Sequence, residues 1–202
     1  GGYYYDFLAL PGSRLGLVIG DVSGNGIAAA LLMASLQASV RGQSMRGEQN
    51  LAQLMANVNS LIYEASASSR YATLFYAQLD PASRRLDYVN AGHNPPLLVR
   101  GGEAIHLETG GTVVGLLPTY TYQQGTIDLQ PGDVLVAFTD GISEAMNLQD
   151  EEWGEERLLA AVRASSGRTA GEMIPELMRA ADAFAAGAPQ HDDMTLVIVK
   201  LQ

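Results

Sequence analysis

Apolar and polar positions in the first third of the chain predict a hairpin followed by two helices. The stretch Tyr3–Leu10 is aromatic and β-prone, a Pro-Gly-Ser turn follows, and Arg14–Ile19 is apolar again. After a glycine-rich segment, Ala28–Val40 is rich in alanine, leucine and methionine, which favours a helix that can pack closely on a sheet. A second helix is predicted over Asn50–Ser66, where apolar residues recur at amphipathic spacing.

The rest of the chain alternates short strands with turn formers and then returns to helices. Strands are predicted over Ala72–Leu79, Arg85–Asn90, Pro96–Arg100, Ala104–Leu107, Tyr122–Leu129, Asp133–Phe138 and Met194–Leu201. Before the last strand, helices are predicted over Glu155–Ala164 and Ala170–Ala185. Helix pairs inserted into antiparallel strands indicate an α+β layered fold. Because no segment has the composition of a linker, we expect residues 1–202 to form a single domain.

The composition then excludes several classes of protein. Hydrophobic residues make up 47% of the 202, enough to build a core and too many for a disordered chain. The formal net charge of −10 argues against a nucleic-acid partner, because phosphate backbones would repel the chain and it contains no basic patch. No apolar run approaches the ~20 residues that a membrane helix needs. The absence of cysteine excludes disulfides and thiolate metal sites, and it is typical of a reducing cytoplasm.

Three aspartates stand at the same kind of place, at the end of a predicted strand. Asp21 follows one strand, Asp140 follows another and precedes Gly141, and Asp192 lies just before the last strand. A carboxylate on a rigid base beside open backbone suits a hard divalent cation, which takes oxygen ligands. Several such carboxylates gathered without a cation would repel one another.

Each of these positions also has a simpler interpretation. Asp140-Gly141 is a common turn dipeptide, and Asp21 could cap the helix that follows it. Asp192-Asp193 could be a solvated loop. The spacing of the three aspartates alone does not decide between a metal site and these local roles.

A series of short motifs runs along the whole chain in a fixed order. The first is Gly20-Asp21-Val22-Ser23-Gly24-Asn25-Gly26, with Gly1–Phe7 before it and Ala28–Met33 after it. Others follow at Tyr71–Phe75, Asn90–Pro96, Pro131–Asp133, Thr139–Ala145 and Asp192–Thr195. Each motif is weak alone, but the ordered set is specific. It resembles the SpoIIE/RsbU-like branch of the PPM-type metal-dependent serine/threonine phosphatases.

This resemblance implies both a fold and a metal site. The fold is an α-β-β-α four-layer sandwich, with two antiparallel sheets flanked by helix pairs. The site holds two Mn²⁺ or Mg²⁺ ions at one edge of the sandwich. Carried over to this sequence, Asp21 would bridge the ions, the backbone carbonyl of Val22 would be a further ligand, and Asp140 and Asp192 would hold one ion.

Two neighbours of these ligands are expected to support them without binding metal. Asp193 stands where relatives carry Asn or Asp. His191 adjoins Asp192, so it could orient that ligand or act as a general acid.

The sequence departs from the family pattern at Tyr3, where the family usually has an aspartate that helps to hold the metals. Asp6 is not a simple substitute, because residues 3 and 6 of a strand point to opposite faces. We therefore expect the second metal site to be weakened.

The implied reaction is hydrolysis of phosphoserine or phosphothreonine by metal-activated water. Because the chain has no cysteine, a phosphocysteine intermediate is impossible. By resemblance, the substrate is a phosphorylated anti-sigma-factor antagonist of the STAS type. Two alternatives stay open: a degenerate module that binds a phosphorylated partner without turnover, which Tyr3 favours, and a two-metal hydrolase of small phosphoesters.

The chain opens at Gly1-Gly2 without a methionine or a signal peptide, so we expect a cytoplasmic fragment of a longer, multidomain protein. An upstream sensor domain or a homodimer partner is expected to act through the helix pair between Ala28 and Ser66, because that pair directly follows Asp21. We expect no nucleic-acid partner and no membrane segment in this fragment.

Overall fold

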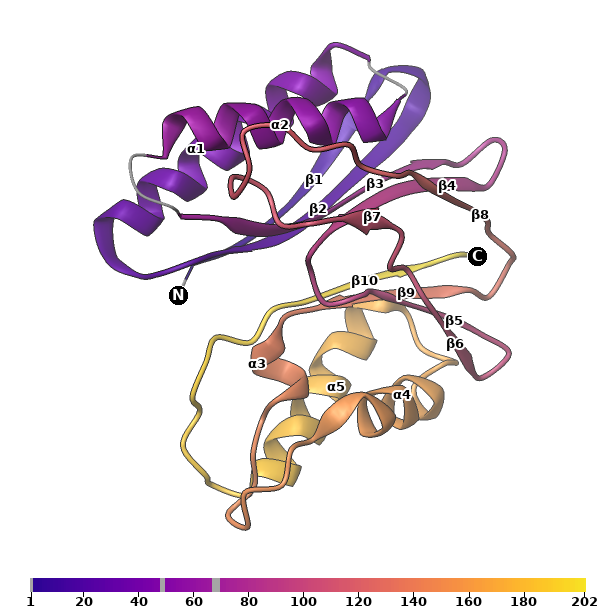
Figure 1. Cartoon of the computed structure of the whole chain (residues 1–202). Helices are drawn as coiled ribbons and strands as arrows, with labels where there is room; N and C mark the ends of the chain where they lie inside the picture. Colours follow the sequence, from indigo (N-terminus) through magenta and orange to yellow (C-terminus); the bar gives the residue numbers. More distant parts are fainter. Residues whose placement is uncertain (1, 48–49, 67–69) are drawn as a thin grey trace. The chain divides into compact units, whose positions relative to one another are not determined.

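Residues 2–47, 50–66 and 70–202 are described in the computed structural model of this chain (Figure 1). The elements fall into two compact units. The first contains residues 1–93 and 107–129, and the second contains residues 94–106 and 130–202. Each unit consists of a sheet with helices packed on it.

The sheet of the first unit grows from the predicted hairpin. Its strands are β1 (Tyr3–Leu10), β2 (Arg14–Val22), β3 (Ala72–Asp80), β4 (Arg85–Ala91), β7 (Gly110–Gly111) and β8 (Gly125–Asp128). Strands β1 to β4 are antiparallel neighbours in sequence order, while β7 and β8 both pair with β4. The 3-10 turn η1 (Pro11–Ser13) joins β1 to β2, with Gly12 and Ser13 in the left-handed region.

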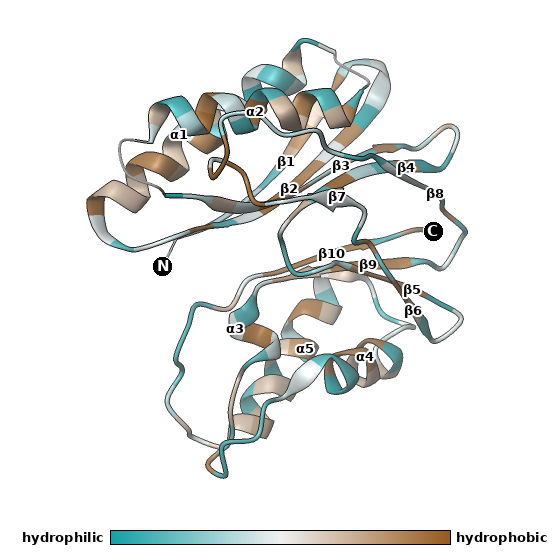
Figure 2. Cartoon of the chain, in the orientation of Figure 1, coloured by the Kyte–Doolittle hydropathy of each residue, from teal (hydrophilic) through white to brown (hydrophobic). Residues whose placement is uncertain are grey.

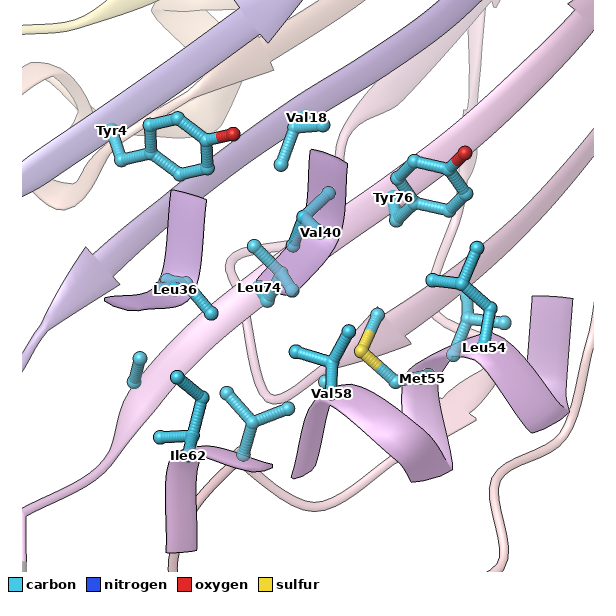
Figure 3. Close-up of a cluster of buried hydrophobic side chains, with 14 of the residues drawn as sticks. Tyr4, Val18, Leu36, Val40, Leu54, Met55, Val58, Ile62, Leu74 and Tyr76 are labelled. Atoms are coloured by element: carbon cyan, nitrogen blue, oxygen red, sulfur yellow. The ribbon is translucent and has the colours of Figure 1, made fainter. Parts of the chain in front are cut away.

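Two helices, α1 (Gly26–Met45) and α2 (Leu51–Ala65), pack on one face of this sheet and bury the core of the unit. Figure 2, coloured by hydropathy, shows hydrophobic residues alternating with hydrophilic ones along both helices. Figure 3 shows side chains of the sheet packed against side chains of the two helices. The labelled residues come from β1, β2 and β3 (Tyr4, Val18, Leu74 and Tyr76) and from α1 and α2 (Leu36, Val40, Leu54, Met55, Val58 and Ile62).

The second unit repeats this plan with a smaller sheet. Its strands, β5 (Leu97–Arg100), β6 (Glu103–His106), β9 (Val134–Phe138) and β10 (Leu196–Lys200), are antiparallel in the order β10-β9-β5-β6. The helices are α3 (Asp140–Ser143), α4 (Gly154–Ala164) and α5 (Ala170–Ala185). Their core includes the fully buried side chains of Leu97, Val136 and Leu158.

The Pro131–Asp133 motif is structural. Asp133 is buried and accepts two hydrogen bonds from the Arg100 guanidinium, at 3.0 and 2.7 Å, and one from the backbone N–H of Gln130 at 2.8 Å. The backbone of this turn also holds the end of the chain, because Leu201 exchanges hydrogen bonds with Gly132 and Asp133. A paired and fully bonded carboxylate of this kind fixes the start of β9.

The predicted elements are present, with shifts at their ends. Helix α1 is longer than predicted at both ends, and β8 begins at Gly125 instead of Tyr122. The first sheet was expected to be purely antiparallel. It is mixed, because the short β7 pairs with β4 in parallel. No helix in the described ranges has the length and apolar character needed to cross a bilayer.

Candidate functional site

Asp21 lies inside β2, paired with Tyr3 of β1 and Thr73 of β3. The prediction that this strand ends at Gly20 is therefore wrong, because the ladder with both neighbours continues to Val22. Side chains alternate along a strand, and Val22 belongs to the core under the helices. The Asp21 carboxylate accordingly lies on the sheet face opposite to α1 and α2.

Gly2 is a site residue that the sequence reasoning missed. A Cβ on this residue would lie 3.0 Å from the carbonyl oxygen of Val22 and 3.6 Å from Oδ1 of Asp21. The two oxygens that the resemblance assigns to metal binding thus border the same small space. The Gly-Gly dipeptide that opens the chain was the available signal, because glycine is selected where backbone or ligands approach closely.

The loop after Asp21 is held by a reciprocal pair of hydrogen bonds. The Ser23 N–H donates to the Tyr71 carbonyl at 2.9 Å, and the Tyr71 N–H donates to Ser23 Oγ at 3.0 Å. These bonds join the loop to the segment that enters β3. The Val22 N–H also donates to the Gly2 carbonyl at 3.1 Å, so the backbone around Asp21 is fixed on both sides.

In the second unit, the turn after β9 contacts the segment before β10. Thr139 donates its N–H to the Thr195 carbonyl at 3.1 Å, and its Oγ1 accepts the Thr195 N–H at 3.0 Å. A Cβ on Gly141 would overlap the carbonyl oxygen of Asp193. The glycine after Asp140 therefore permits close packing of two distant segments, which a simple turn would not require.

This packing brings the carboxyl groups of Asp140 and Asp192 near each other. Burial raises the pKa of Asp140, and the charge of Asp192 raises it further. The pKa of Glu144 is also raised, first by burial and then by the charges of Asp140, Glu152 and Asp192. Carboxylates in this arrangement repel one another, and a bound cation would relieve the repulsion.

Asn94 is a second residue that the sequence reasoning missed. Its side-chain amide donates a hydrogen bond to Oδ1 of Asp140, which orients that carboxylate. The motif that contains Asn94 is a closed turn, because the Asn90 side chain bonds the N–H and the carbonyl of His93 and the carbonyl of Leu107. His93 is buried with its Nδ1 3.0 Å from Thr73 Oγ1, as its predicted structural role requires.

Asp192, Asp193 and His191 lie in the exposed segment before β10, two residues further from the strand than predicted. The Asp192 carboxylate accepts the Asp193 N–H at 2.8 Å. His191 and Asp192 line a pocket of about 400 Å³, together with Glu144. The pocket therefore adjoins the paired carboxylates of the second unit.

Asp6 is not available as a substitute for the missing aspartate at position 3. It lies on the helix side of β1, where the Arg41 guanidinium donates to both of its carboxylate oxygens, at 2.7 and 2.9 Å. Tyr3 stands directly opposite Asp21 in the ladder, so their side chains are on the same sheet face.

The ligands inferred from the resemblance are divided between the two units. Asp21 and Val22 belong to the first unit, and Asp140 and Asp192 belong to the second. Within the part of the chain that the structure describes, no three Asp, Glu or His side chains are grouped as a complete set of metal ligands. The groupings observed are Asp21 with the Val22 carbonyl, and Asp140 with Asp192.

Comparison with known proteins places the chain in a family. The family model for Stage II sporulation protein E (SpoIIE) matches residues 11–202, nearly the whole chain. The chain belongs to the SpoIIE family. The resemblance seen in the ordered motifs is therefore confirmed.

Two relatives show how this SpoIIE-family chain compares with whole proteins. It is 28% identical to phosphoserine phosphatase RsbU of Bacillus subtilis (strain 168), over 98% of this chain and 59% of that protein. It is 27% identical to protein IcfG of Synechocystis sp., over 98% of this chain and 35% of that protein. The chain thus spans only part of the length of these relatives.

Solved structures agree with the predicted fold class of this SpoIIE-family chain. The SiaA-PP2C domain of Pseudomonas aeruginosa has a TM-score of 0.87 at 18% identity, covering all of this chain and 81% of that one. The RsbU and RsbW domains of Rv1364c from Mycobacterium tuberculosis give a TM-score of 0.75 at 28% identity, covering 98% of this chain and 56% of that one. Two sheets with flanking helices, as in PP2C-type domains, are therefore confirmed.

Proposed function

We propose that this SpoIIE-family chain hydrolyses phosphoserine or phosphothreonine on a protein, with divalent cations held by its aspartates. The observation that carries the proposal is the pairing of Asp140 with Asp192, enforced by the close approach at Gly141. Segments about fifty residues apart are packed so that the charge of Asp192 acts on the Asp140 carboxyl. Since that arrangement is unfavourable without a cation, it fits a metal site better than a local turn.

The donor set suits Mn²⁺ or Mg²⁺. We assign as ligands the carboxylates of Asp21, Asp140 and Asp192 and the backbone carbonyl of Val22, all of which are hard oxygen donors. Two ions are proposed, with Asp21 bridging them, and the second site is weakened by the tyrosine at position 3. When bound, the ions would lower the pKa of water and neutralise charge on the phosphoryl group.

The chain's own residues supply orientation. Asn94 holds the Asp140 carboxylate in place through its amide, and the Thr139–Thr195 bonds fix the backbone on which that aspartate stands. His191 lies next to Asp192 on the pocket wall, where it could donate a proton to the leaving alkoxide. Asp193 supports the site by fixing the loop, since its N–H bonds the Asp192 carboxylate.

For the substrate we propose a phosphorylated anti-sigma-factor antagonist of the STAS type. Support comes from the relative RsbU, which is named a phosphoserine phosphatase. We further propose that an upstream sensor domain or a second copy of the chain controls activity through α1 and α2. Helix α1 begins five residues after Asp21, so movement of the helix would reach the proposed bridging ligand.

A phosphatase assay with a phosphoserine protein and millimolar Mn²⁺ tests the proposal. Turnover should need the metal and should fall by at least two orders of magnitude in Asp21→Ala, Asp140→Ala and Asp192→Ala, because each removes a charged ligand. Glu103→Ala is the matched control, since this exposed acid on β6 lies outside the site. Comparable turnover of a nucleotide would indicate a hydrolase of small phosphoesters.

The second candidate is a degenerate module that binds a phosphorylated partner without hydrolysing it. The tyrosine opposite Asp21 is the observation that favours it. Metal-independent binding of the phosphoprotein, with no turnover at any Mn²⁺ concentration, would identify this function. Turnover that the three alanine variants abolish would exclude it.

A further inference from the structure

Arg70 is set apart from the other cations of this acidic chain. Five of the 12 Lys and Arg form ion pairs with Asp or Glu among the described residues, as Arg41 does with Asp6 and Arg100 with Asp133. Arg70 has no hydrogen-bond acceptor or ion-pair partner among the described residues, yet it is half-buried. A guanidinium that is partly desolvated and unpaired is free to take an anion from solution.

The guanidinium of Arg70 lies on the loop that follows Asp21. A Cβ on Gly24 would meet Nη1 of Arg70 at 2.6 Å and Cζ at 3.7 Å. Gly24 also has a φ of +86°, so both its conformation and its neighbour require glycine. The absence of a side chain at this position lets the guanidinium rest against the backbone, two residues from Val22.

The residue that follows Arg70 is held by hydrogen bonds to the loop after Asp21. This residue, Tyr71, exchanges hydrogen bonds with Ser23 in that loop. The Arg70 carbonyl lies 3.3 Å from the position of a Cβ on Gly115, next to the bridge between Ala72 and Val114. The hydrogen bonds at Tyr71 therefore join the segment that carries Arg70 to the loop that its guanidinium contacts.

Arg70 also lines a pocket of about 200 Å³ between the start of α1 and the end of α2, with Ala28, Leu31 and Ser66. None of the described residues that line it is acidic. A planar guanidinium with several N–H donors is matched to the oxygens of a phosphate, and a pocket without carboxylates leaves its charge uncompensated.

We propose that Arg70 binds the phosphoryl oxygens of the substrate, from its position against Gly24 in the loop that follows the proposed ligands Asp21 and Val22. This proposal rests on the proposed phosphatase function and adds to it a residue that contacts substrate. Arg70 would hold the dianionic group by charge-assisted hydrogen bonds, and Gly24 would keep the guanidinium close to the loop.

The test compares Arg70→Met and Arg70→Lys with the wild-type protein. In Arg70→Met, the KM for a phosphoserine peptide should rise on the order of 10- to 100-fold, because a hydrogen bond to a charged group is lost. The affinity for inorganic phosphate, measured by calorimetry on the Mn²⁺-loaded protein, should weaken by a similar factor. Arg70→Lys should have a KM and a phosphate affinity between those of Arg70→Met and the wild type, since lysine keeps the positive charge but lacks the planar guanidinium.

Two further measurements separate substrate binding from a structural role. The melting temperature and the Mn²⁺ concentration for half-maximal effect should stay near wild-type values in Arg70→Met. Arg46→Met is the matched control, because Arg46 is exposed, has no partner among the described residues and lies at the opposite end of α1. It should leave KM and phosphate affinity unchanged.

The proposal is overturned if Arg70→Met binds phosphate as tightly as the wild type. It is also overturned if KM changes only in step with metal affinity and stability, since Arg70 would then merely support the loop. Failure of the phosphatase function itself looks different: the wild-type protein would show no metal-dependent turnover in any assay.

Discussion

At the scale of single residues, position 3 provides a test of the proposed second ion. Tyr3 and Asp21 are direct partners across β1 and β2, so an aspartate at position 3 would place a second carboxylate on the same sheet face. We expect Tyr3→Asp to lower the Mn²⁺ concentration for half-maximal activity roughly tenfold, because one charged ligand is added. A metal titration of phosphatase activity measures this shift.

Tyr5→Asp is the control for Tyr3→Asp. Tyr5 is on the same strand and is exposed, so the substitution adds the same charge one pleat further along, opposite Ile19. An equal gain in both variants would mean that the added charge acts at long range and that position 3 is not a ligand position.

The repulsion around Asp140 gives a prediction for the metal-free protein. Folding raises the pKa of the Asp140 carboxyl, so this group binds its proton more tightly in the folded state. The protonated group therefore favours folding at low pH. This contribution to stability is lost as the pH rises through the raised pKa. At pH 7 the charged Asp140 therefore destabilises the metal-free fold. We expect Asp140→Asn to melt slightly higher than the wild type in EDTA at neutral pH.

The difference should disappear when the pH falls below the ordinary range of carboxyl pKa values, where the wild-type group is protonated as well. Thermal unfolding in EDTA, from neutral pH to below the carboxyl pKa values, measures the difference in melting temperature between Asp140→Asn and the wild type. The Asn94 amide keeps an acceptor in Asp140→Asn, so loss of that hydrogen bond does not confound the comparison. A variant less stable than the wild type at every pH would contradict the prediction.

Sequence reasoning could propose the acidic residues of the candidate site and not the neutral ones around them. Asp140 and Asp192 were recognisable from strand ends and motif order, and the structure places them together. Gly2 and Asn94 act through space, by leaving room for two oxygens and by orienting a carboxylate 46 residues away. Such roles depend on tertiary contacts, which periodicity and local propensity do not encode.

At the scale of elements, α1 presents one buried and one exposed side. Leu36 is fully buried in the core of the first unit, whereas Leu31 on the same helix is 64% exposed. We expect Leu36→Ala to reduce the free energy of unfolding by about 2–5 kcal/mol, because a cavity is left in a packed core. Leu31→Ala should change it by less than ~0.5 kcal/mol.

Chemical denaturation of Leu36→Ala and Leu31→Ala measures the free energy of unfolding of each variant. Equal losses would show that the exposed side of α1 is also packed in solution, for example against a second copy of the chain. The pair thus tests the helix packing and the proposed dimer together.

Long periodic elements were predictable, and short ones were not. Helices α4 and α5 and strand β3 agree with the prediction to within a residue, because their apolar spacing continues over several turns or pleats. Strand β7 has two residues and α3 has four, so neither is long enough to show a repeating pattern of apolar and polar residues. The segment before β8 is irregular even though it is aromatic, since Tyr120 and Tyr122 pack edge to face next to Gly111.

At the scale of the whole molecule, the proposed ligand assignment predicts that aspartates of both units contribute to stability when metal is bound. A ligand at 100 times its dissociation constant stabilises a fold by about 2.7 kcal/mol. For a chain of this size, each kcal/mol corresponds to about 2–4 °C in the melting temperature. We therefore expect saturating Mn²⁺ to raise the melting temperature by roughly 5–10 °C over EDTA.

Asp21→Ala in the first unit and Asp192→Ala in the second should each remove most of this increase. Differential scanning calorimetry with and without Mn²⁺ measures it, with Glu103→Ala as the control that keeps the full effect. If Asp21→Ala keeps the full effect too, the first unit contributes no ligand and the proposed bridging role of Asp21 is wrong.

The anchoring of Leu201 to the Pro131–Asp133 turn has a practical consequence for labelling. Strand β10 runs five residues away from the Asp192 end, which separates that end from Leu201 by roughly 17 Å. A fluorophore or affinity handle attached after Gln202 would emerge at the far end of the second sheet from the paired carboxylates. Immobilising the protein by that end should leave access for a bulky phosphoprotein unobstructed.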